Sequence, residues 1–315
     1  FVEWECRGAD IWIEHPEFYQ TRVVVSAPCT LVAHYATAVA CTLVKSPAQQ
    51  WGGFIVDGVE YPNTDTVTFW WGRNSYHHIQ ATTPDINDDS TEAYAFSHWS
   101  DGGENPHWVE ASASFVLCAY YTHQYRVDIT KDPPRDFGYL WVDSSFIFDD
   151  EYHDWWDEGS VHSIAVSTPD LSTRVRYYLS HWSDGDTAYM RDVGPVDGVV
   201  NLVAYYDAQV RVAVTKDPAE SYGYIEINDS TYEGVASATR WIDMGDSATV
   251  SVSAVDIHEG TDSAYTFSHW NDDTTDTLRP KELGALTDGV DLVAHYDAGI
   301  YNLEFSVSPT VWDLS

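Results

Sequence analysis

The chain has 315 residues, of which 44% are hydrophobic and 15% aromatic, so it carries enough apolar surface to build cores and is not a disordered acidic tail. Fifty acidic residues face fifteen Lys and Arg, a net charge of −35, which argues against binding to nucleic acid or to anionic lipid heads. The most apolar run, at 30–44, is shorter than the 20 or so residues of a membrane span, so we expect no direct membrane insertion.

The chain begins with a divergent copy of a motif that recurs later in the sequence. FVEW, with Trp4, is followed by LVAHY at 31–35. From residue 39 a complete series follows in order: VACTLVKSP, GGFIVDG at 52–58, Trp70, YAFSHWSDG at 94–102 and LCAYY at 117–121. The first 38 residues therefore correspond to the C-terminal half of an incomplete module.

The same series follows twice more. The second copy runs through YRVDITKDP from 125, GYLWVDS at 138–144, Trp155, YYLSHWSDG at 177–185 and LVAYY at 202–206. The third runs through VRVAVTKDP from 210, GYIEIND at 223–229, Trp241, YTFSHWNDD at 265–273 and LVAHY at 292–296. We therefore expect an incomplete module at 1–38, repeats at 39–124, 125–209 and 210–299, and the first strand of a further module at 300–315.

The repeated segments have the character of β-strands. They are five to eight residues long, are rich in Val, Ile, Tyr, Trp and Thr, and are separated by Gly, Pro, Asp, Asn and Ser. Lys-Asp-Pro after the first strand is a stop, because Pro cannot continue a central ladder. The sequence predicts an all-β fold, a tandem array of small β-sandwich or β-grasp-like modules of about 85 residues.

The series resembles the divergent internalin-type B-repeat of bacterial and archaeal cell-surface proteins. The segments G-[YF]-x-x-V-D-G, W-x-x-x-G, F-S-x-W-S-D-G and L-x-A-x-Y carry the resemblance over nearly the whole chain, and FSHWSDG is the most specific of them. The Gly of W-x-x-x-G is present as Gly159 and Gly245, but Asn74 stands in the first repeat, where Asn tolerates positive φ. The resemblance implies a stalk, spacer or adhesive module and no catalysis.

The two ends suggest a way for copies to join. The chain starts in the second half of one module and ends just after the first strand of another, so a strand missing from one molecule is available on the next. Such head-to-tail pairing builds open filaments. The ends are explained equally well if the sequence is a segment of a longer tandem array. Both alternatives describe part of an extended tandem assembly.

Ser97-His98-Trp99-Ser100-Asp101 contains the residue types of a hydrolase triad. Adjacent strand residues point to opposite faces, so Ser97 and His98 are expected to diverge, and the motif recurs in every repeat as packing motifs do. We therefore predict no enzymatic activity. The equivalent His98, His181 and His269 each lack a paired His, which favours hydrogen-bonded strand residues over metal ligands. Asp101, Asp184 and Asp272 are weak calcium candidates, with ordinary Asx turns as the alternative.

Four cysteines, Cys6, Cys29, Cys41 and Cys118, lie in the first 118 residues, without a CxxC motif. Three pairings are available, and the repeat favours Cys6–Cys29 and Cys41–Cys118, with four buried free thiols as the alternative. Asn228-Asp229-Ser230 is an N-glycosylation sequon.

The tryptophans are the expected centres of the repeats. Alternation from Tyr94 and Phe96 places Trp99 on the opposite face, so either a bulge re-aims this side chain or both faces are covered. The expected core aromatics are Trp4, Trp99, Trp182 and Trp270, together with Trp70, Trp155 and Trp241.

We predict a non-enzymatic extracellular structural protein in a saline environment, a segment of a cell-surface stalk, sheath or filament assembled head-to-tail from copies of itself. No cofactor is expected other than the weak calcium candidates. A carbohydrate-binding adhesin, with exposed Trp70 or Trp155 stacking on a glycan, and a viral surface fibre are the alternatives.

Overall fold

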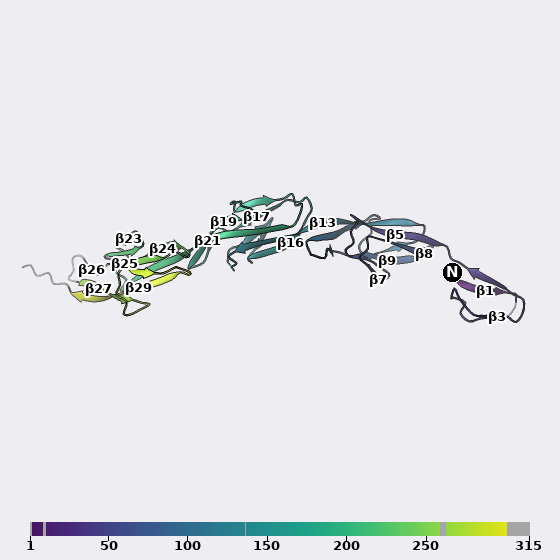
Figure 1. Ribbon diagram of the computed structural model, residues 1–315, viewed down its shortest axis with the longest axis horizontal. Helices are drawn as coiled ribbons and strands as arrows, with labels where there is room; N and C mark the ends of the chain where they lie inside the picture. Colours follow the sequence, from purple (N-terminus) through teal and green to yellow (C-terminus); the bar gives the residue numbers. More distant parts are fainter. Residues whose placement is uncertain (1, 9–10, 136, 259–262, 301–315) are drawn as a thin grey trace, which may run out of the picture. The chain divides into compact units, whose positions relative to one another are not determined.

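The computed structural model is all-β. It describes residues 2–8, 11–135, 137–258 and 263–300, and these form 29 strands and no α-helix (Figure 1). None of the described segments is a helix long and apolar enough to cross a membrane. Two compact units are present, residues 1–128 with 153–161 and 194–201, and residues 129–152 with 162–193 and 202–315.

The first repeat consists of two facing sheets. The order of the first sheet is β8-β5-β13-β11-β10, in which β5 and β13 are parallel and the other neighbours antiparallel; the order of the second is β12-β9-β6-β7. The strands of the first sheet are β5 (Ala38–Ser46), β8 (Thr66–Gly72), β10 (Asp85–Ile86), β11 (Glu92–Trp99) and β13 (Phe115–Asp132). Those of the second are β6 (Gly53–Val56), β7 (Val59–Pro62), β9 (Tyr76–Ala81) and β12 (His107–Glu110).

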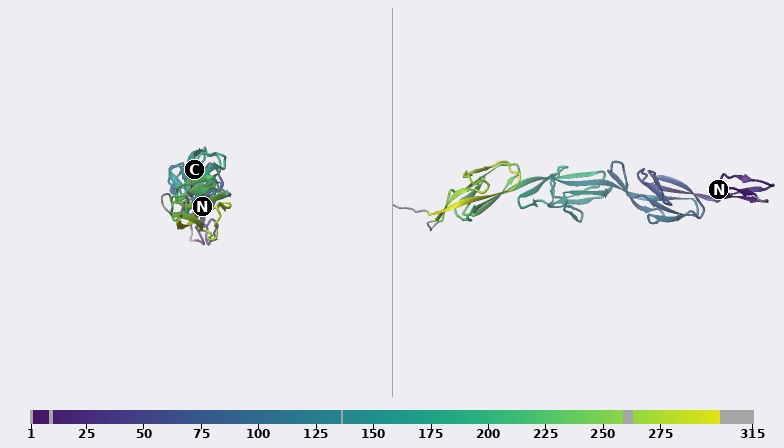
Figure 2. Two further views of the ribbon diagram at one scale, coloured as in Figure 1. Left: turned by 90° about the vertical axis from the view of Figure 1, so that its left-hand side faces the viewer. Right: turned by 90° about the horizontal axis from the view of Figure 1, so that it is seen from below.

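The same pairing scheme recurs along the chain. The second four-stranded sheet has the order β15-β14-β17-β20 and the third β23-β22-β25-β28. The other strands of these repeats are β16 (Glu151–Asp157), β18 (Asp170–Leu171), β19 (Val175–Trp182), β21 (Val200–Asp217), β24 (Ser237–Asp243), β26 (Val255–Ile257), β27 (Ser263–Trp270) and β29 (Val290–Ile300). The four-stranded sheets are formed by β14 (Leu140–Val142), β15 (Ser145–Ile147), β17 (His162–Val166), β20 (Met190–Val193), β22 (Tyr224–Ile227), β23 (Ser230–Glu233), β25 (Ala248–Val252) and β28 (Lys281–Leu283). Figure 2 shows the strands from two further sides.

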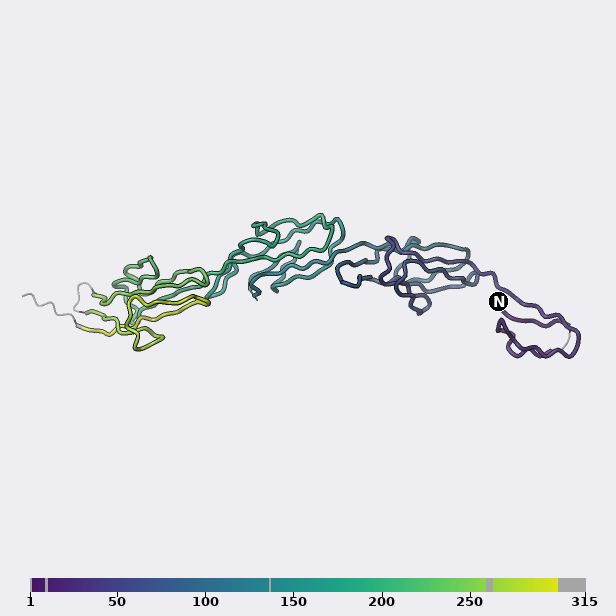
Figure 3. The backbone as a smooth tube through the Cα atoms, in the orientation of Figure 1, coloured from purple at the N-terminus to yellow at the C-terminus, as the bar shows by residue number. Residues whose placement is uncertain are grey.

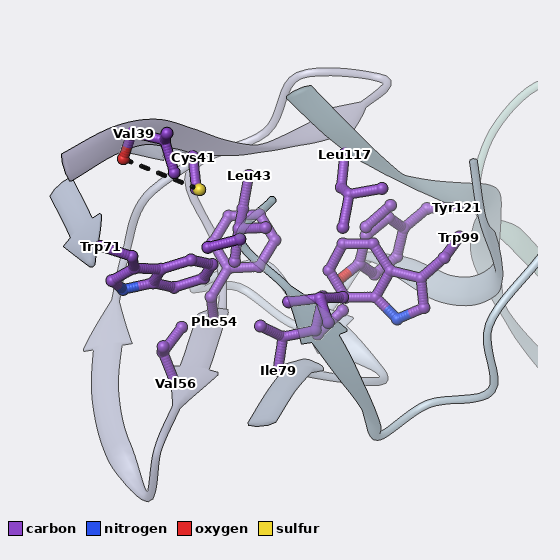
Figure 4. Close-up of a cluster of buried hydrophobic side chains, with 14 of the residues drawn as sticks. Val39, Cys41, Leu43, Phe54, Val56, Trp71, Ile79, Trp99, Leu117 and Tyr121 are labelled. Carbon is purple, nitrogen blue, oxygen red and sulfur yellow. Dashed lines mark hydrogen bonds between the residues drawn. The ribbon is translucent and has the colours of Figure 1, made fainter. Parts of the chain in front are cut away.

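Alternation of side chains builds the core between the sheets. Along β5 every second residue is buried, so that Val39, Cys41 and Leu43 face the four-stranded sheet. Figure 4 shows this core, where Phe54 and Ile79 from the four-stranded sheet meet residues of the other sheet. The third repeat has an equivalent core around Trp270. The sandwich component of the predicted fold thus matches the layers, and the described residues offer no helix for a grasp-like arrangement.

A β-bulge aims the tryptophan of each repeat into the core. The register between β11 and β13 shifts between Phe96 and His98, and the same shift occurs between Leu179 and His181 and between Phe267 and His269. The extra residue reverses the alternation, so that Trp99, Trp182 and Trp270 are each 0% exposed. Of the two predicted explanations, the bulge is the one found.

Single long strands close one repeat and open the next. The first part of β21 pairs with β19 from Ala204 to Val210, and its second part pairs with β24 and, in parallel, with β29 from Val212 to Asp217. Strand β13 likewise has 18 residues, and its range spans the end of the first predicted repeat and the start of the second. Figure 3 traces the chain along these strands.

A two-stranded hairpin precedes the first repeat. It pairs β1 (Glu3–Arg7) with β4 (Thr30–His34), while β2 (Trp12–Ile13) pairs with β3 (Val23–Val24). Trp4 lies opposite Ala33, as Trp99 lies opposite Ala119 and Trp270 opposite Ala294. The hairpin is therefore built like the closing strands of a repeat, and the half-module at 1–38 stays a prediction.

Candidate functional site

A buried ion pair joins β5 to β10, two strands of the same sheet of the first repeat. The Nζ of Lys45, at the end of β5, lies 2.7 Å from Oδ2 of Asp85, and both side chains are 0% exposed. Lys45 also donates a hydrogen bond to the carbonyl of Trp51, and Gln49 donates one to the same carboxylate oxygen at 2.7 Å. The charges are thus removed from water but provided with polar partners, as buried charges require.

Equivalent pairs occupy the other two repeats. Lys216 lies 2.6 Å from Asp256, again with both side chains fully buried. In the second repeat Lys131 is 3.8 Å from Asp170, because the guanidinium of Arg135 occupies the near position at 2.5 Å. We call the three pairs Lys45–Asp85, Lys131–Asp170 and Lys216–Asp256 the core ion pairs.

Two further positions support each carboxylate, one directly and one through its neighbour. A hydroxyl three residues before each aspartate, from Thr82, Ser167 or Ser253, donates to its second oxygen. A tyrosine hydroxyl then donates to the carbonyl of that Ser or Thr at 2.8–2.9 Å; the three tyrosines are Tyr121, Tyr206 and Tyr296. Each core ion pair is therefore the centre of a polar network that reaches the closing strand of its repeat.

A glycine leaves the space for the carboxylate. Gly52, Gly138 and Gly223 all have positive φ, at 61°, 77° and 62°. A Cβ on these residues would lie 1.8–2.0 Å from an Oδ1 atom of the aspartate, which is well inside contact distance. The first Gly of the repeated GGF and GY segments is thus required both by its backbone conformation and by the close approach of the aspartate.

Burial shifts the titration of the groups around the pairs. Loss of water lowers the pKa of Lys45 and Lys131 below the ordinary value of 10.5, although nearby carboxylates oppose the shift. Burial also raises the pKa of Tyr121, Tyr206 and Tyr296, so these phenols stay protonated and donate their hydrogen bonds. The arrangement therefore connects strands and has no exposed nucleophile or acid.

These lysines were missed by the sequence analysis, which interpreted Lys-Asp-Pro only as the end of a strand. The chain has four lysines, and three of them, Lys45, Lys131 and Lys216, stand at one repeat position. Because the chain has so few lysines, their recurrence at one repeat position was the sign in the sequence that they have a specific role.

The motif tryptophans have similar but not identical surroundings. The indole Nε1 of Trp182 donates to the carbonyl of Ala188 at 2.8 Å, and that of Trp270 donates to Leu278 at 3.0 Å. The Nε1 of Trp99 is buried without a hydrogen-bond partner. Trp4 is half-buried and donates to the carbonyl of Phe18 at 3.2 Å.

The Ser-His-Asp motif does not assemble a triad. Contrary to the expectation that they diverge, Ser97 Oγ and His98 Nδ1 lie 3.0 Å apart, because the bulge breaks strict alternation. Asp101 turns instead to His107, whose Nε2 is 3.0 Å from its carboxylate. The exposed His98 ring stacks on Tyr120 at 4.7 Å.

The calcium candidates bind basic side chains of their own repeats. Asp101 contacts His107, Asp184 contacts Arg191, and Asp272 contacts Lys281 at 3.0 Å. Within the described residues no group of three or more His, Cys, Asp or Glu side chains is placed to hold a metal ion. These turns are therefore internal ion pairs, and calcium is not proposed.

All four cysteines are free thiols in the structure. The predicted Cys41–Cys118 disulfide is wrong, because Cys41 faces the core of β5 whereas Cys118 lies opposite Val44 and faces outward. Cys6 and Cys29 lie close enough for the first thiol to contribute to the raised pKa of the second, after burial. The Cys6–Cys29 disulfide stays a prediction.

The remaining candidates are side chains on the outer faces. Asn228 occupies a turn with φ of 49°, and its side-chain oxygen accepts a hydrogen bond from the amide of Thr249 at 2.8 Å. Trp70 is 73% exposed, whereas Trp155 is half-buried and Trp241 lies under the guanidinium of Arg176 at 4.5 Å. The prediction that Trp70 is a core aromatic is therefore wrong, and the three equivalent tryptophans differ in exposure.

Comparison with known proteins gives only distant structural likenesses. No family model matches the chain, and no curated protein matches it. Among solved structures, the Bacillus anthracis TIE protein gives a TM-score of 0.26 at 7% identity, over 88% of this chain and 55% of that one. A Streptococcal ancillary pilin and BcpA, the major pilin subunit of Bacillus cereus, each give 0.25, at 10% and 8% identity, over 82% of this chain and 99% of theirs.

The chain thus spans about half the length of the first of these structures and nearly the whole of the other two. At such TM-scores the likeness carries no argument about fold or function. The resemblance to the internalin-type B-repeat stays a prediction.

Proposed function

We propose that the chain is a non-enzymatic structural segment of an extracellular stalk or filament, in which tandem β-sandwich modules of about 85 residues carry load along the chain. The observation that carries this proposal is the sharing of strands. Strand β21 closes one repeat through β19 and opens the next through β24 and β29, so tension passes through a continuous hydrogen-bonded strand.

The core ion pairs support the same function. Each pair joins a lysine in the opening strand of its repeat to an aspartate about 40 residues later in the sequence. That aspartate begins the hairpin whose second strand carries the motif tryptophan. Moving the first strand away while the core stays dry would leave one charge buried without its partner, which costs several kcal/mol, so the strand can leave only when both charges reach water together. A repeat closed in this way suits a load-bearing role.

The outer surface suits a role in salty surroundings. With a net charge of −35, copies repel one another at low ionic strength, and a Debye length of about 3 Å at 1 M salt removes most of that repulsion. We propose that the protein works at a cell surface in a saline environment and associates head-to-tail with its own copies.

Negative-stain imaging of the purified chain at 0.1 M and at 2 M NaCl tests the proposal, with light scattering for mass. We expect linear polymers at high salt and shorter particles at low salt. Discrete single chains at every salt concentration would contradict head-to-tail assembly. If the chain bound a sugar on a glycan array and Trp70→Ala abolished that binding, the adhesin alternative would be favoured.

A further inference from the structure

One part of the outer sheet surface of the first repeat carries no Asp, Glu, Lys or Arg. It is formed by the side chains of β8, β5 and residues 115–121 of β13 that point away from the core. Several of these side chains are well exposed: Trp70 is 73% exposed, Val116 64% and Tyr120 38%. We call this surface the uncharged face and define it by Ala40, Thr42, Thr68, Trp70, Val116 and Tyr120.

The second repeat holds an ion pair at the same strand positions. Arg126 and Asp128 stand where the first repeat has Ala40 and Thr42, and Nε of Arg126 lies 2.9 Å from Oδ2 of Asp128. In the first repeat the hydroxyl of Thr42 instead lies 2.9 Å from the hydroxyl of Thr68, on the neighbouring strand. This strand position therefore tolerates charges in the same fold.

The third repeat carries a second example. Arg211 stands in place of Ala40 and Asp291 in place of Val116, and the guanidinium of Arg211 lies 2.6 Å from the carboxylate of Asp291. The absence of charge from the first repeat is therefore not a requirement of the sandwich. On a chain with a net charge of −35, an exposed face without charge is typical of a contact surface.

We propose that the uncharged face binds the same face of a second copy of the chain, sheet against sheet. In such an isologous contact each uncharged residue meets an uncharged residue, so no carboxylate loses its water or lies against a like charge. Flat faces of Thr, Val and Ala suit the packing of two sheets about 10 Å apart. The inference adds a side-to-side contact to the proposed head-to-tail assembly and does not depend on it.

The polar groups of the face favour a protein partner over a sugar. The hydroxyls of Thr42 and Thr68 bond to each other, and the adjoining side chains of Ala40 and Val116 have no polar atoms. Few groups are thus available near Trp70 to bind the hydroxyls of a glycan, which need hydrogen-bond partners once they are buried. A second copy needs no such partners, because its own face has the same composition.

The size of the face predicts a weak association. Three strands about 4.8 Å apart, each with roughly seven residues of about 3.4 Å, cover roughly 300–400 Å². A stable interface takes about 800 Å² from each partner, so pairing through this face alone is weak. The net charge of −35 opposes pairing at low ionic strength, and a Debye length of about 3 Å at 1 M salt removes most of that repulsion. We expect pairs at high salt and high protein concentration.

A transplanted ion pair tests the face by analytical ultracentrifugation at 2 M NaCl. Ala40→Arg/Thr42→Asp brings the pair of the second repeat into the first and leaves the net charge unchanged. We expect the dissociation constant of the pair to rise by at least about tenfold, because charges would be buried between the sheets. Ala213→Asp, which places an aspartate beside Arg211 at the equivalent position of the third repeat, should leave pairing intact.

A second set of variants changes one exposed residue at a time. Val116→Asp puts a carboxylate on the uncharged face at a residue whose side chain contributes little to the core. Asn201→Asp adds the same charge at the equivalent position of the second repeat. We expect only Val116→Asp to weaken pairing. Unchanged pairing in both Val116→Asp and Ala40→Arg/Thr42→Asp would overturn the proposal.

The thiol of Cys118 reports on the face directly. Cys118 lies between Val116 and Tyr120 in β13 and is half-buried, whereas Cys41 is 0% exposed. In a chain with Cys6→Ser and Cys29→Ser, a maleimide at 2 M NaCl should label Cys118 more slowly as the protein concentration rises. In Ala40→Arg/Thr42→Asp the rate should not depend on protein concentration.

The outcomes separate this contact from the proposed head-to-tail assembly. Discrete dimers without longer particles would support the face and contradict head-to-tail assembly, and filaments lying side by side in pairs would support both. Single chains or single filaments, with a Cys118 labelling rate that is independent of protein concentration, would overturn the face as a contact between copies. Sugar binding that is lost in Ala40→Arg/Thr42→Asp, without any self-association of the unaltered chain, would overturn it in favour of a glycan.

Discussion

Replacement of Lys216 by Met tests whether the core ion pairs hold the repeats together. Lys216 and Asp256 are both fully buried and 2.6 Å apart. Met has a similar length and no charge, so the variant leaves the carboxylate in the core with only its hydroxyl partner. Loss of one member of a buried pair costs about 3–5 kcal/mol. A domain of 85 residues has a total stability of about 4–13 kcal/mol, so the third repeat should lose a large share of it.

Hydrogen exchange followed by mass spectrometry is the appropriate assay, because a tandem array does not unfold in one step and a single midpoint would be ill-defined. Amides of β25 in the third repeat should exchange roughly two to four orders of magnitude faster in Lys216→Met. Amides of β9 in the first repeat, whose own pair is intact, serve as the internal control. A change of less than about threefold in β25 would refute the structural role of the pair.

The double variant Lys216→Met/Asp256→Asn separates the pair from its surroundings. If the interaction is ionic, the double variant should lose less stability than the sum of the losses in the two single variants, because neither charge is left alone.

The intact mass of the unaltered chain tests whether the lysine and the aspartate of each pair are joined by a covalent bond. We expect the mass of the sequence, whereas a mass lower by one water for each pair would show that ammonium and carboxylate had condensed to an amide.

Four further outcomes follow from the same geometry. Gly223→Ala should destabilise the third repeat by about 1–3 kcal/mol, because its Cβ would overlap the aspartate and its φ is positive. Raising NaCl from 0.1 M to 1 M should raise the melting temperature by screening the net charge, and a lower temperature would contradict the brine interpretation. The hydrogen bonds from Arg191 lower the pKa of Asp184 below 3.8, so its contribution is complete above that pH and is lost as the pH falls through the lowered value; calorimetry from pH 5 to pH 2 should show this loss, and Arg191→Met should diminish it. Thiol labelling of the native chain after mild oxidation should find Cys6 and Cys29 joined and Cys41 reduced and unreactive; labelling of all three would contradict the Cys6–Cys29 disulfide.

The repeat was accessible from sequence because it depends on local chemistry. Trp99 recurs with its flanking residues, and the strand segments alternate, so the all-β fold and the buried tryptophans could be predicted. The relation of Ser97 to His98 could not, because the alternation of β11 offers a bulge only as one of two explanations, and the site of the bulge depends on the partner strand β13. The face of every later residue in that strand then depends on the bulge.

The core ion pairs were hidden by a general expectation about lysine, which is rarely buried. Alternation along β5 places Lys45 on the same buried face as Leu43. The strand pattern therefore predicted a buried side chain, whereas the residue type predicted an exposed one. The partner Asp85 follows 40 residues later, and no local rule joins the two. Only the coincidence of three repeats, read together with the scarcity of lysine, resolves the conflict in favour of burial.

The distribution of cations predicts that such an acidic chain stays folded over a range of salt concentrations. All four of its lysines are buried in the repeats, where mobile ions do not reach and screening is weak. The surface repulsion depends on ionic strength, but the contacts that close each repeat do not. Salt should therefore govern the association of copies far more than the integrity of each module, so a filament of this kind can assemble and dissociate in response to salt while its repeats stay folded.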